Sequence, residues 1–285
     1  YVPGATLRTA DRMDEAVAAA QLADVAVVAL GEGAYAETAG NIRDLMLPEA
    51  QRTLLQQIAA TGTPVVLVLL QGRPRTLGAA HEAADAVLAG SNPGPEGGQA
   101  IMDVLYGNVN PSGHLPYTYP STPTGYATYD HKPSERLAAD FGMEGAEPLF
   151  AFGDGMSYTS FAYRDLQMTP ASISASDVRD GDTIRVEVTI ENTGDRAGKD
   201  VVQLYVSDRV ATVTPAARRL KRFAKVDLEP GESRRLTFTL SRDDLSFIGR
   251  EGAAVVEPGT FQIRIEDQLK DLEVTGERFQ VPPAP

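Results

Sequence analysis

The sequence contains no cysteine and no tryptophan, and only three histidines among its 285 residues. Without cysteine the chain has no disulfides, thiolate metal sites or thiol nucleophiles, and its redox compartment is left undecided. The three histidines, His81, His114 and His131, lie too far apart in sequence to form a metal-binding motif. No apolar run reaches the length of about 18 residues that a membrane-spanning helix needs. We therefore expect no metal, no other cofactor and no membrane span.

Positive charge is also scarce, because 26 lysines and arginines face 39 aspartates and glutamates and give a net charge of −13. This balance argues against nucleic acid and against anionic membranes, since both need basic patches. The hydrophobic content of 42% and the charged content of 23% are ordinary for a globular protein. The length is sufficient for two domains.

The first part of the chain alternates helical and strand patterns. Helical spacing predicts helices over residues 13–22, 48–60, 76–84 and 96–105, and short apolar runs predict strands over residues 24–30, 64–70 and 86–89. This alternation is typical of a parallel sheet with helices on its faces. We predict an α/β domain over residues 1–115.

The rest of the chain has a different periodicity. Residues 116–160 are rich in proline, glycine, tyrosine and serine, and we predict that they form a connecting wrap. Residues 183–190 and 235–240 alternate strictly between apolar and polar side chains, and further strand patterns follow between Pro-Gly and Asn-Thr-Gly turn signals. We predict an all-β sandwich of the fibronectin III or immunoglobulin type over residues 161–285. Tyr205, Phe223 and Phe238 are predicted to lie in its core.

The loop that follows the first predicted strand is the most informative segment. Residues 31–41 read GEGAYAETAGN, with two carboxylates, a tyrosine and three glycines before the next helix begins. Open α/β sheets bind ligands at the carboxyl ends of their strands, so this loop is a candidate site for acid–base chemistry or sugar binding. The letters also match G-x-G-x-x-A, a dinucleotide fingerprint, but that motif needs a helix to start within the glycines, and none is predicted there.

Several long motifs resemble those of glycoside hydrolase family 3. Residues 92–116 read NPGPEGGQAIMDVLYGNVNPSGHLP, residues 150–161 read FAFGDGMSYTSF, and the pattern ENTG…VVQLYV at 191–206 is similar to the family's fibronectin-like domain. The resemblance covers nearly the whole chain in order. It departs from the family pattern at His114, where lysine is common, and at Asp154, where tyrosine is common.

This resemblance implies a retaining, exo-acting β-glycosidase of the β-glucosidase type. The family's usual order is a (β/α)₈ barrel that carries an Asp nucleophile, then the α/β domain, then often the fibronectin-like domain. By that resemblance Glu37 is the general acid/base, and Tyr35, Glu32 and Arg43 are substrate-binding candidates. Glu32 is also a rival for the acid/base role, and the alternative for Glu37 is an ordinary solvated glutamate.

No barrel motif is present, so the resemblance implies that the nucleophile comes from a barrel partner and that the chain alone is inactive. Residues 1–4 resemble the end of a strand, which predicts an incomplete α/β domain with an uncovered apolar edge or face. The other function that we consider is a non-catalytic carbohydrate-binding or scaffolding module. The resemblance favours a periplasmic or secreted location, with a cytoplasmic one still open, and leaves the sugar and homo-oligomer formation open.

Overall fold

The computed structural model describes residues 11–125, 128–132 and 147–282. The contacts divide them into a first unit (residues 11–106, 119–125 and 147–150) and a second unit (residues 107–118, 128–132 and 151–282), which we describe separately. The strand end expected at residues 1–4 lies outside the described residues, as does part of the expected 116–160 connection.

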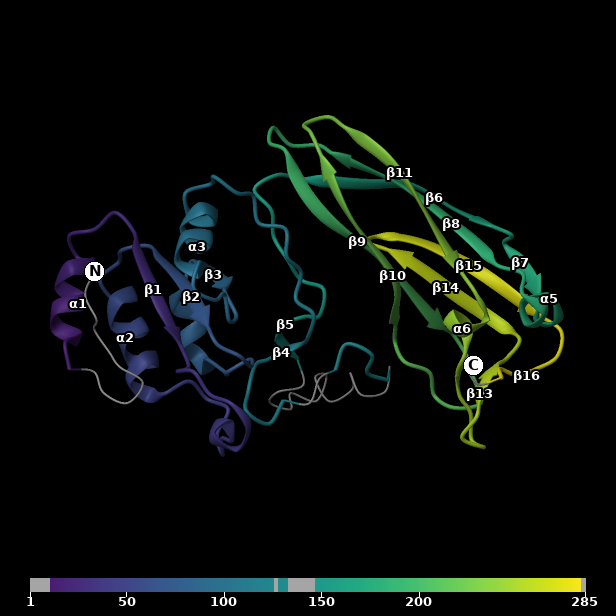
Figure 1. Cartoon of the computed structure of the whole chain (residues 1–285), viewed down its shortest axis with the longest axis horizontal. Coiled ribbons are helices and arrows are strands. Elements are labelled where there is room, and N and C mark those ends of the chain that lie inside the picture. Colours follow the sequence, from purple (N-terminus) through teal and green to yellow (C-terminus); the bar gives the residue numbers. More distant parts are fainter. Residues whose placement is uncertain (1–10, 126–127, 133–146, 283–285) are drawn as a thin grey trace. The chain divides into compact units, whose positions relative to one another are not determined.

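The first unit is built on a parallel sheet whose strands β1 (Ala26–Gly31), β2 (Val65–Leu70) and β3 (Ala86–Ala89) lie side by side in that order (Figure 1). The β2 strand, VVLVLL, lies between its two neighbours, and four of its six side chains are buried. Such a run suits a central strand of a parallel sheet, where both faces are covered. Within the described residues β1 is an edge strand, and its Val27 is 51% exposed, so the sheet has apolar surface at the expected edge.

Helices and short turns precede, connect and follow these strands along the chain. The helices are α1 (Met13–Ala20), α2 (Glu49–Ala59) and α3 (Gly97–Leu105), with short 3₁₀ turns η1 (Glu37–Gly40) and η2 (Gly78–Ala83). The α2 helix starts after Pro48, which lacks the N–H that a first turn leaves unpaired, and buries Leu54, Leu55 and Ile58. Only the η2 turn forms where a helix over 76–84 was predicted, because Gly78 interrupts it with a φ of +55°. The short strands β4 (Tyr119–Pro120) and β5 (Pro148–Phe150) also belong to this unit.

The second unit is a β-sandwich. One sheet has the order β10-β9-β14-β15-β7, a second has the order β11-β8-β6, and a small third sheet has the order β12-β13-β16. The strands are β6 (Phe161–Thr169), β7 (Ser172–Ser174), β8 (Ile184–Asn192), β9 (Gly198–Asp208), β10 (Arg219–Leu228), β11 (Ser233–Leu240), β12 (Phe247–Ile248), β13 (Ala254–Val256), β14 (Gly259–Ile265), β15 (Gln268–Thr275) and β16 (Phe279–Gln280), with the short helices α5 (Ala175–Asp180) and α6 (Arg242–Leu245). The predicted fold class, an α/β parallel-sheet domain followed by an all-β sandwich, is confirmed.

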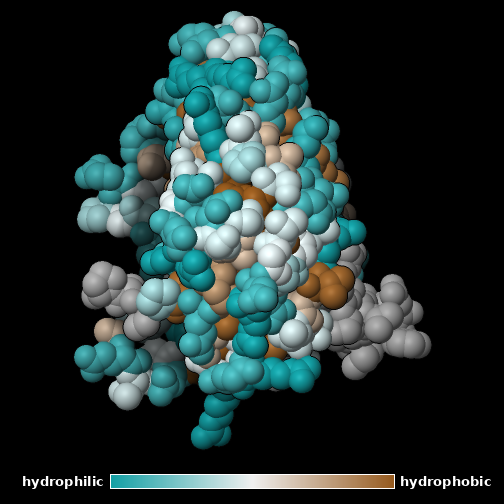
Figure 2. All heavy atoms as spheres, turned by 90° about the vertical axis from the view of Figure 1, so that its right-hand side faces the viewer, coloured by the Kyte–Doolittle hydropathy of each residue, from teal (hydrophilic) through white to brown (hydrophobic). Residues whose placement is uncertain are grey.

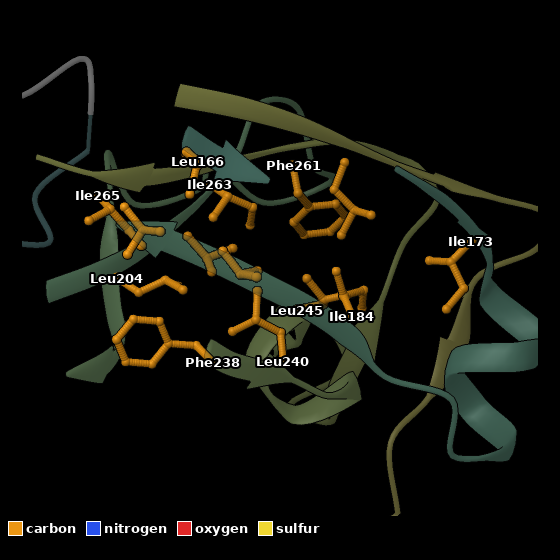
Figure 3. Packing of buried hydrophobic residues seen from close by; sticks show 14 of the residues in the cluster. Leu166, Ile173, Ile184, Leu204, Phe238, Leu240, Leu245, Phe261, Ile263 and Ile265 are labelled. Atoms are coloured by element: carbon orange, nitrogen blue, oxygen red, sulfur yellow. The ribbon is translucent and has the colours of Figure 1, made fainter. Parts of the chain in front are cut away.

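The core of the sandwich follows from the alternating pattern of its strands. In β8 every second side chain, from Ile184 to Ile190, is fully buried, as a period of two requires. Figure 3 shows Leu204, Phe261 and Ile263 packed with these side chains between the sheets. The surface that Figure 2 turns to the viewer is mainly hydrophilic, with its apolar residues in small separate areas.

The prediction for the three sandwich aromatics is correct for Tyr205 and Phe238, which are 6% and 7% exposed. It is wrong for Phe223, which is 67% exposed. Phe223 lies on β10, the edge strand of the larger sheet, and alternation along that strand places it on the solvent face. Its aromatic character alone could not distinguish the two faces.

Candidate active-site loop

The loop after β1, residues 32–48, is called the Glu37 loop here. Its starting point is fixed by Gln51 on α2, whose side-chain amide accepts a hydrogen bond from the N–H of Gly31 at 2.9 Å and donates one to its carbonyl at 3.0 Å. Residue 31 must be glycine, because a Cβ there would lie 1.8 Å from the carbonyl oxygen of Leu70. The end of β1 and the first residue of the loop are therefore held rigidly.

Glu37 opens the η1 turn with its side chain exposed to solvent. Among the described residues its carboxylate makes no hydrogen bond and no ion pair. Its backbone φ of +49° lies in the left-handed region, which costs a non-glycine residue on the order of 1 kcal/mol. Strain of this kind is found where the surrounding structure enforces it, often at functional sites. The carboxyl group is exposed and can be reached by a ligand.

Glu32 is placed differently. Its side chain is only 9% exposed, and its two carboxylate oxygens accept hydrogen bonds from Arg73 Nε at 3.3 Å and from Arg75 Nη1 at 3.0 Å. Two arginines thus occupy the oxygens of this carboxylate with charge-assisted hydrogen bonds. Glu32 therefore ties the start of the loop to the segment that follows β2.

Tyr35 lies under the guanidinium of Arg73, whose Cζ is 4.1 Å from the ring centroid. The Nε of Arg73 also donates a hydrogen bond to the hydroxyl of Tyr35 at 3.1 Å. The tyrosine remains 41% exposed, so part of its surface is open to a ligand. Tyr35, Glu32 and Arg73 form one cluster at the carboxyl ends of β1 and β2.

Arg43 does not join this cluster. It is exposed, and among the described residues it has no ion-pair or hydrogen-bond partner. The neighbouring Asp44 accepts a hydrogen bond from the N–H of Met46 at 2.9 Å, which shapes the end of the loop.

Sequence reasoning missed the structural importance of the segment after β2, residues 71–76, which is called the β2 loop here. It favoured capping and interdomain hydrogen bonds for Arg73 and did not consider Arg75. The hydroxyl of Tyr119 accepts a hydrogen bond from Gln71 Nε2 at 2.8 Å and donates one to the carbonyl of Arg75 at 2.5 Å. The available signal was positional, since the carboxyl ends of neighbouring parallel strands meet at one edge of the sheet.

The dinucleotide fingerprint is not in the required setting. After β1 ends at Gly31, residues 32–36 continue as irregular chain into the four-residue η1 turn, so no α-helix begins at the glycines. Within the described parts of the chain, no group of three or more His, Cys, Asp or Glu side chains is arranged to hold a metal ion.

The sequence model of the "Glycosyl hydrolase family 3 C-terminal domain" matches residues 4–158, more than half of the chain, and that of the "Fibronectin type III-like domain" matches residues 200–268. The chain belongs to glycosyl hydrolase family 3. The family's expected fold and domain types are thereby confirmed.

Among its family 3 relatives, the lysosomal beta glucosidase of Dictyostelium discoideum is 44% identical over 91% of this chain and 32% of its own length. The periplasmic beta-glucosidase of Salmonella typhimurium is 37% identical over 89% of this chain and 34% of its own length. The chain thus spans about a third of the length of these curated relatives. A solved structure of the Listeria innocua beta-glucosidase in complex with glucose matches 96% of this chain and 40% of its own, with a TM-score of 0.85 and 33% identity.

No helix in the described portion of this family 3 chain is both long enough and apolar enough to cross a membrane.

Proposed function

We propose that this chain is the C-terminal part of a retaining, exo-acting β-glucosidase in which Glu37 is the general acid/base. The observation that supports this most is the contrast between the two carboxylates of the loop. Glu37 is exposed and unpaired among the described residues, whereas Glu32 is bound by Arg73 and Arg75. Of the two, only Glu37 has carboxylate oxygens without a described partner, and we therefore assign the acid/base role to it.

In this proposal the reaction needs a second carboxylate, an Asp on a family 3 barrel that the chain does not contain. The Asp attacks the anomeric carbon while protonated Glu37 donates its proton to the leaving oxygen, and the glycosidic bond breaks. Water then attacks the anomeric carbon of the resulting glycosyl-enzyme, its proton passes to the carboxylate of Glu37, and the bond to the Asp breaks, which releases the sugar and the free Asp carboxylate. The two carboxyl groups should lie about 5–5.5 Å apart, as in retaining enzymes.

The exposed part of the Tyr35 ring is proposed to contact the sugar, since amphipathic aromatics pack well against sugar faces. Glu32 is proposed to contribute to substrate binding by holding Arg73 and Arg75 in place beside the substrate. Arg43, exposed on the same loop, is the remaining substrate-binding candidate. The names of the Dictyostelium and Salmonella relatives support a β-glucoside as the substrate, and the periplasmic name supports a periplasmic or secreted location.

The acid/base role is tested with Glu37→Gln in a protein that joins this chain to a family 3 barrel. General acid catalysis contributes roughly 10²–10⁴-fold, but a good leaving group needs little protonation. Hydrolysis of alkyl glucosides should therefore fall by about that factor, and hydrolysis of dinitrophenyl glucoside should fall far less. Azide should partly restore turnover of the activated substrate, because it attacks the glycosyl-enzyme without a general base.

Glu49→Gln is the matched control, because Glu49 is also an exposed glutamate of the first unit but lies on α2. It should leave both rates unchanged. If Glu32→Gln shows the leaving-group dependence and azide rescue while Glu37→Gln does not, the assignment of Glu37 is wrong.

The need for a barrel is tested on the 285-residue chain alone, which should not hydrolyse aryl β-glucosides. Double displacement requires both carboxylates, and water cannot replace the nucleophile at a useful rate. Reproducible turnover by the isolated chain would contradict the proposal. Binding of oligosaccharide without any turnover after a barrel is added would favour the alternative, a non-catalytic carbohydrate-binding module.

A further inference from the structure

The Glu37 loop is attached to the β2 loop at three places. Near its start, Glu32 binds Arg73 and Arg75. Near its end, the Nε of Arg75 donates to the carbonyl of Met46 at 3.1 Å. Backbone hydrogen bonds from Leu47 N–H to the carbonyl of Thr76 and from Thr76 N–H to the carbonyl of Leu45 add a short ladder there. Both ends of the loop are thus fixed without any contribution from its middle.

The middle of the loop is held through Tyr35. Its ring lies against Gly40, where a Cβ would meet the ring Cδ2 at 2.4 Å, and against Gly72, where a Cβ would meet the hydroxyl at 2.5 Å. Gly40 is the last residue of the η1 turn that Glu37 opens, and Gly72 belongs to the β2 loop. The ring therefore connects the turn that carries Glu37 to the segment after β2.

Arg73 covers this ring. Its Cζ is 4.1 Å from the ring centroid, and its Nε donates to the Tyr35 hydroxyl at 3.1 Å and to Glu32 at 3.3 Å. Its Nη2 is buried and has no hydrogen-bond partner among the described residues. The guanidinium is thus held by stacking and by one shared N–H rather than by a full set of hydrogen bonds. The position of this guanidinium therefore favours stacking on the Tyr35 ring over a complete set of hydrogen bonds.

We propose that Arg73 is a positioning residue that fixes the backbone of the Glu37 turn by clamping Tyr35 against Gly40. The inference rests on the proposed acid/base role of Glu37, because only then does the position of that turn affect a reaction. Arg73 itself moves no proton. The left-handed backbone of Glu37 needs an external constraint of this kind, since a free loop would relax to a more common conformation.

The clamp predicts a distinct role for each of the two arginines. Arg75 binds Glu32 and the carbonyl of Met46, so its loss should loosen the ends of the loop and lower the stability of the first unit. Arg73 binds the partly exposed Tyr35 and should affect the order of the turn more than the stability of the fold. A lysine at residue 73 keeps the charge but loses the planar stacking surface, so it should restore the clamp only in part.

The order of the turn can be measured directly because the chain has no cysteine. We suggest the variant Ala39→Cys, at an exposed position in η1, labelled with a nitroxide in the 285-residue chain. Electron paramagnetic resonance should show a restricted label on the otherwise unchanged chain. Arg73→Ala and Tyr35→Ala should each convert most of the signal to a mobile component, and Tyr35→Phe, which keeps the ring, should retain most of the restricted one.

Arg12→Ala is the matched control, because Arg12 lies on the first unit and its ion pair with Glu15 is remote from the loop in sequence. It should leave the label restricted. Circular dichroism checks that each variant is folded, and Tyr35→Ala supplies the test if Arg73→Ala does not fold. A folded Arg73→Ala or Tyr35→Ala chain with an unchanged restricted label overturns the clamp.

The link to the reaction is tested in the protein that joins this chain to a barrel. Arg73→Ala should lower kcat for alkyl glucosides about 10–100-fold, with a smaller change in KM and a smaller effect on dinitrophenyl glucoside. Arg73→Lys should recover part of the loss. A mobile label together with unchanged kcat values would overturn the positioning role. If Glu37→Gln instead lacks the leaving-group dependence, the proposed function fails while the measured loop order still decides the clamp.

Discussion

The imidazole of His114 is predicted to make the second unit more stable at acidic than at alkaline pH. Its Nδ1 lies 2.6 Å from the carbonyl of Gly153, and its Nε2 lies 3.1 Å from a carboxylate oxygen of Asp200. The doubly protonated imidazolium donates to both of these oxygens, whereas a neutral ring donates to only one. A neutral Nδ1 would instead accept from the side-chain amide of Gln203, which is 3.3 Å away. The hydrogen bond to Asp200 raises the pKa of His114, and burial opposes it only in part.

The surroundings of this pair contain further ionisable groups. Tyr163 donates a hydrogen bond to the second oxygen of Asp200 at 2.5 Å. Burial raises the pKa of Asp200, but the hydrogen bonds from His114 and Tyr163 outweigh it and hold the pKa below its usual value. The charge of Glu266, an exposed residue, adds to the rise in the His114 pKa, and the charge of Arg218 favours the ionised form of Glu266.

The magnitude follows from burial and from the type of hydrogen bond. The side chains of His114 and Asp200 are only 18% and 14% exposed, so solvent screens the pair weakly. A charge-assisted hydrogen bond in such a place contributes about 1.5–3 kcal/mol. Its removal by His114→Gln should lower the free energy of unfolding by about 2 kcal/mol at pH 5.5. For a unit of this size that corresponds to a Tm lower by roughly 4–8 °C.

The sign of the pH dependence is fixed by the direction of the pKa shift. The pKa of His114 is raised in the folded state, so the stabilisation is complete below the unfolded value of about 6.5 and is lost as the pH rises through the folded pKa. The difference between the unchanged chain and His114→Gln should therefore be largest at pH 5.5 and much smaller at pH 9. His114→Lys should keep the ion pair and lose this pH dependence, because lysine stays charged up to about pH 10.

Thermal unfolding followed by circular dichroism at pH 5.5, 7 and 9 measures these differences, with the transitions of the two units fitted separately. His81→Gln is the matched control. His81 lies in the first unit, where its Nδ1 contacts the carbonyl of Gly78 and no described carboxylate pairs with it. A deficit of His114→Gln that stays constant or grows from pH 5.5 to pH 9 would refute the reasoning.

The parts of the fold that sequence could predict are those set by periodicity. Alternation from Ile184 to Ile190 identified a strand with one buried face, and the apolar run at residues 64–70 identified a buried parallel strand. Both patterns arise because the buried positions of a strand recur at a regular spacing along the chain. The domain boundaries expected at residues 115 and 160 remain predictions.

The candidate site was predictable in its location but not in its contacts. A loop with carboxylates after a parallel strand pointed to the carboxyl end of the sheet as the candidate site, which stays a prediction. Nothing in the sequence shows that Arg73 and Arg75 pair with Glu32 across more than 40 residues. Side-chain pairing between loops has no period, so it follows only from the three-dimensional arrangement. The same limit explains Phe223, whose edge position becomes evident only once β10 is placed in its sheet. The roles of Glu37, Tyr35 and Arg43 stay predictions.

Three further predictions, made on four substitutions, test the energetics of the fold. Asp208→Asn should stabilise the second unit by on the order of 1 kcal/mol at pH 7.5 and leave its stability unchanged at pH 3. Burial raises the pKa of this partly exposed carboxyl to about 6, so its ionised form disfavours the folded state. Urea unfolding at the two pH values measures the difference, and an equal gain at both would contradict the prediction. Leu204→Ala, at a fully buried position, should lower the free energy of unfolding in urea by about 2–5 kcal/mol. Phe223→Ser, on the solvent face of β10, should change it by no more than about 0.5 kcal/mol. Comparable losses for the two variants would show that Phe223 is wrongly assigned to the solvent face. Tyr119 is only 1% exposed, and its hydroxyl accepts a hydrogen bond from Gln71 and donates one to a backbone carbonyl of the β2 loop. Tyr119→Phe removes this hydroxyl, so it leaves a buried donor and a buried acceptor without their partner. Each such loss costs about 1–3 kcal/mol, so the thermal transition of the first unit should fall while that of the second stays in place. An unchanged first transition would mean that water replaces the hydroxyl, and that the β2 loop does not depend on Tyr119 for its position.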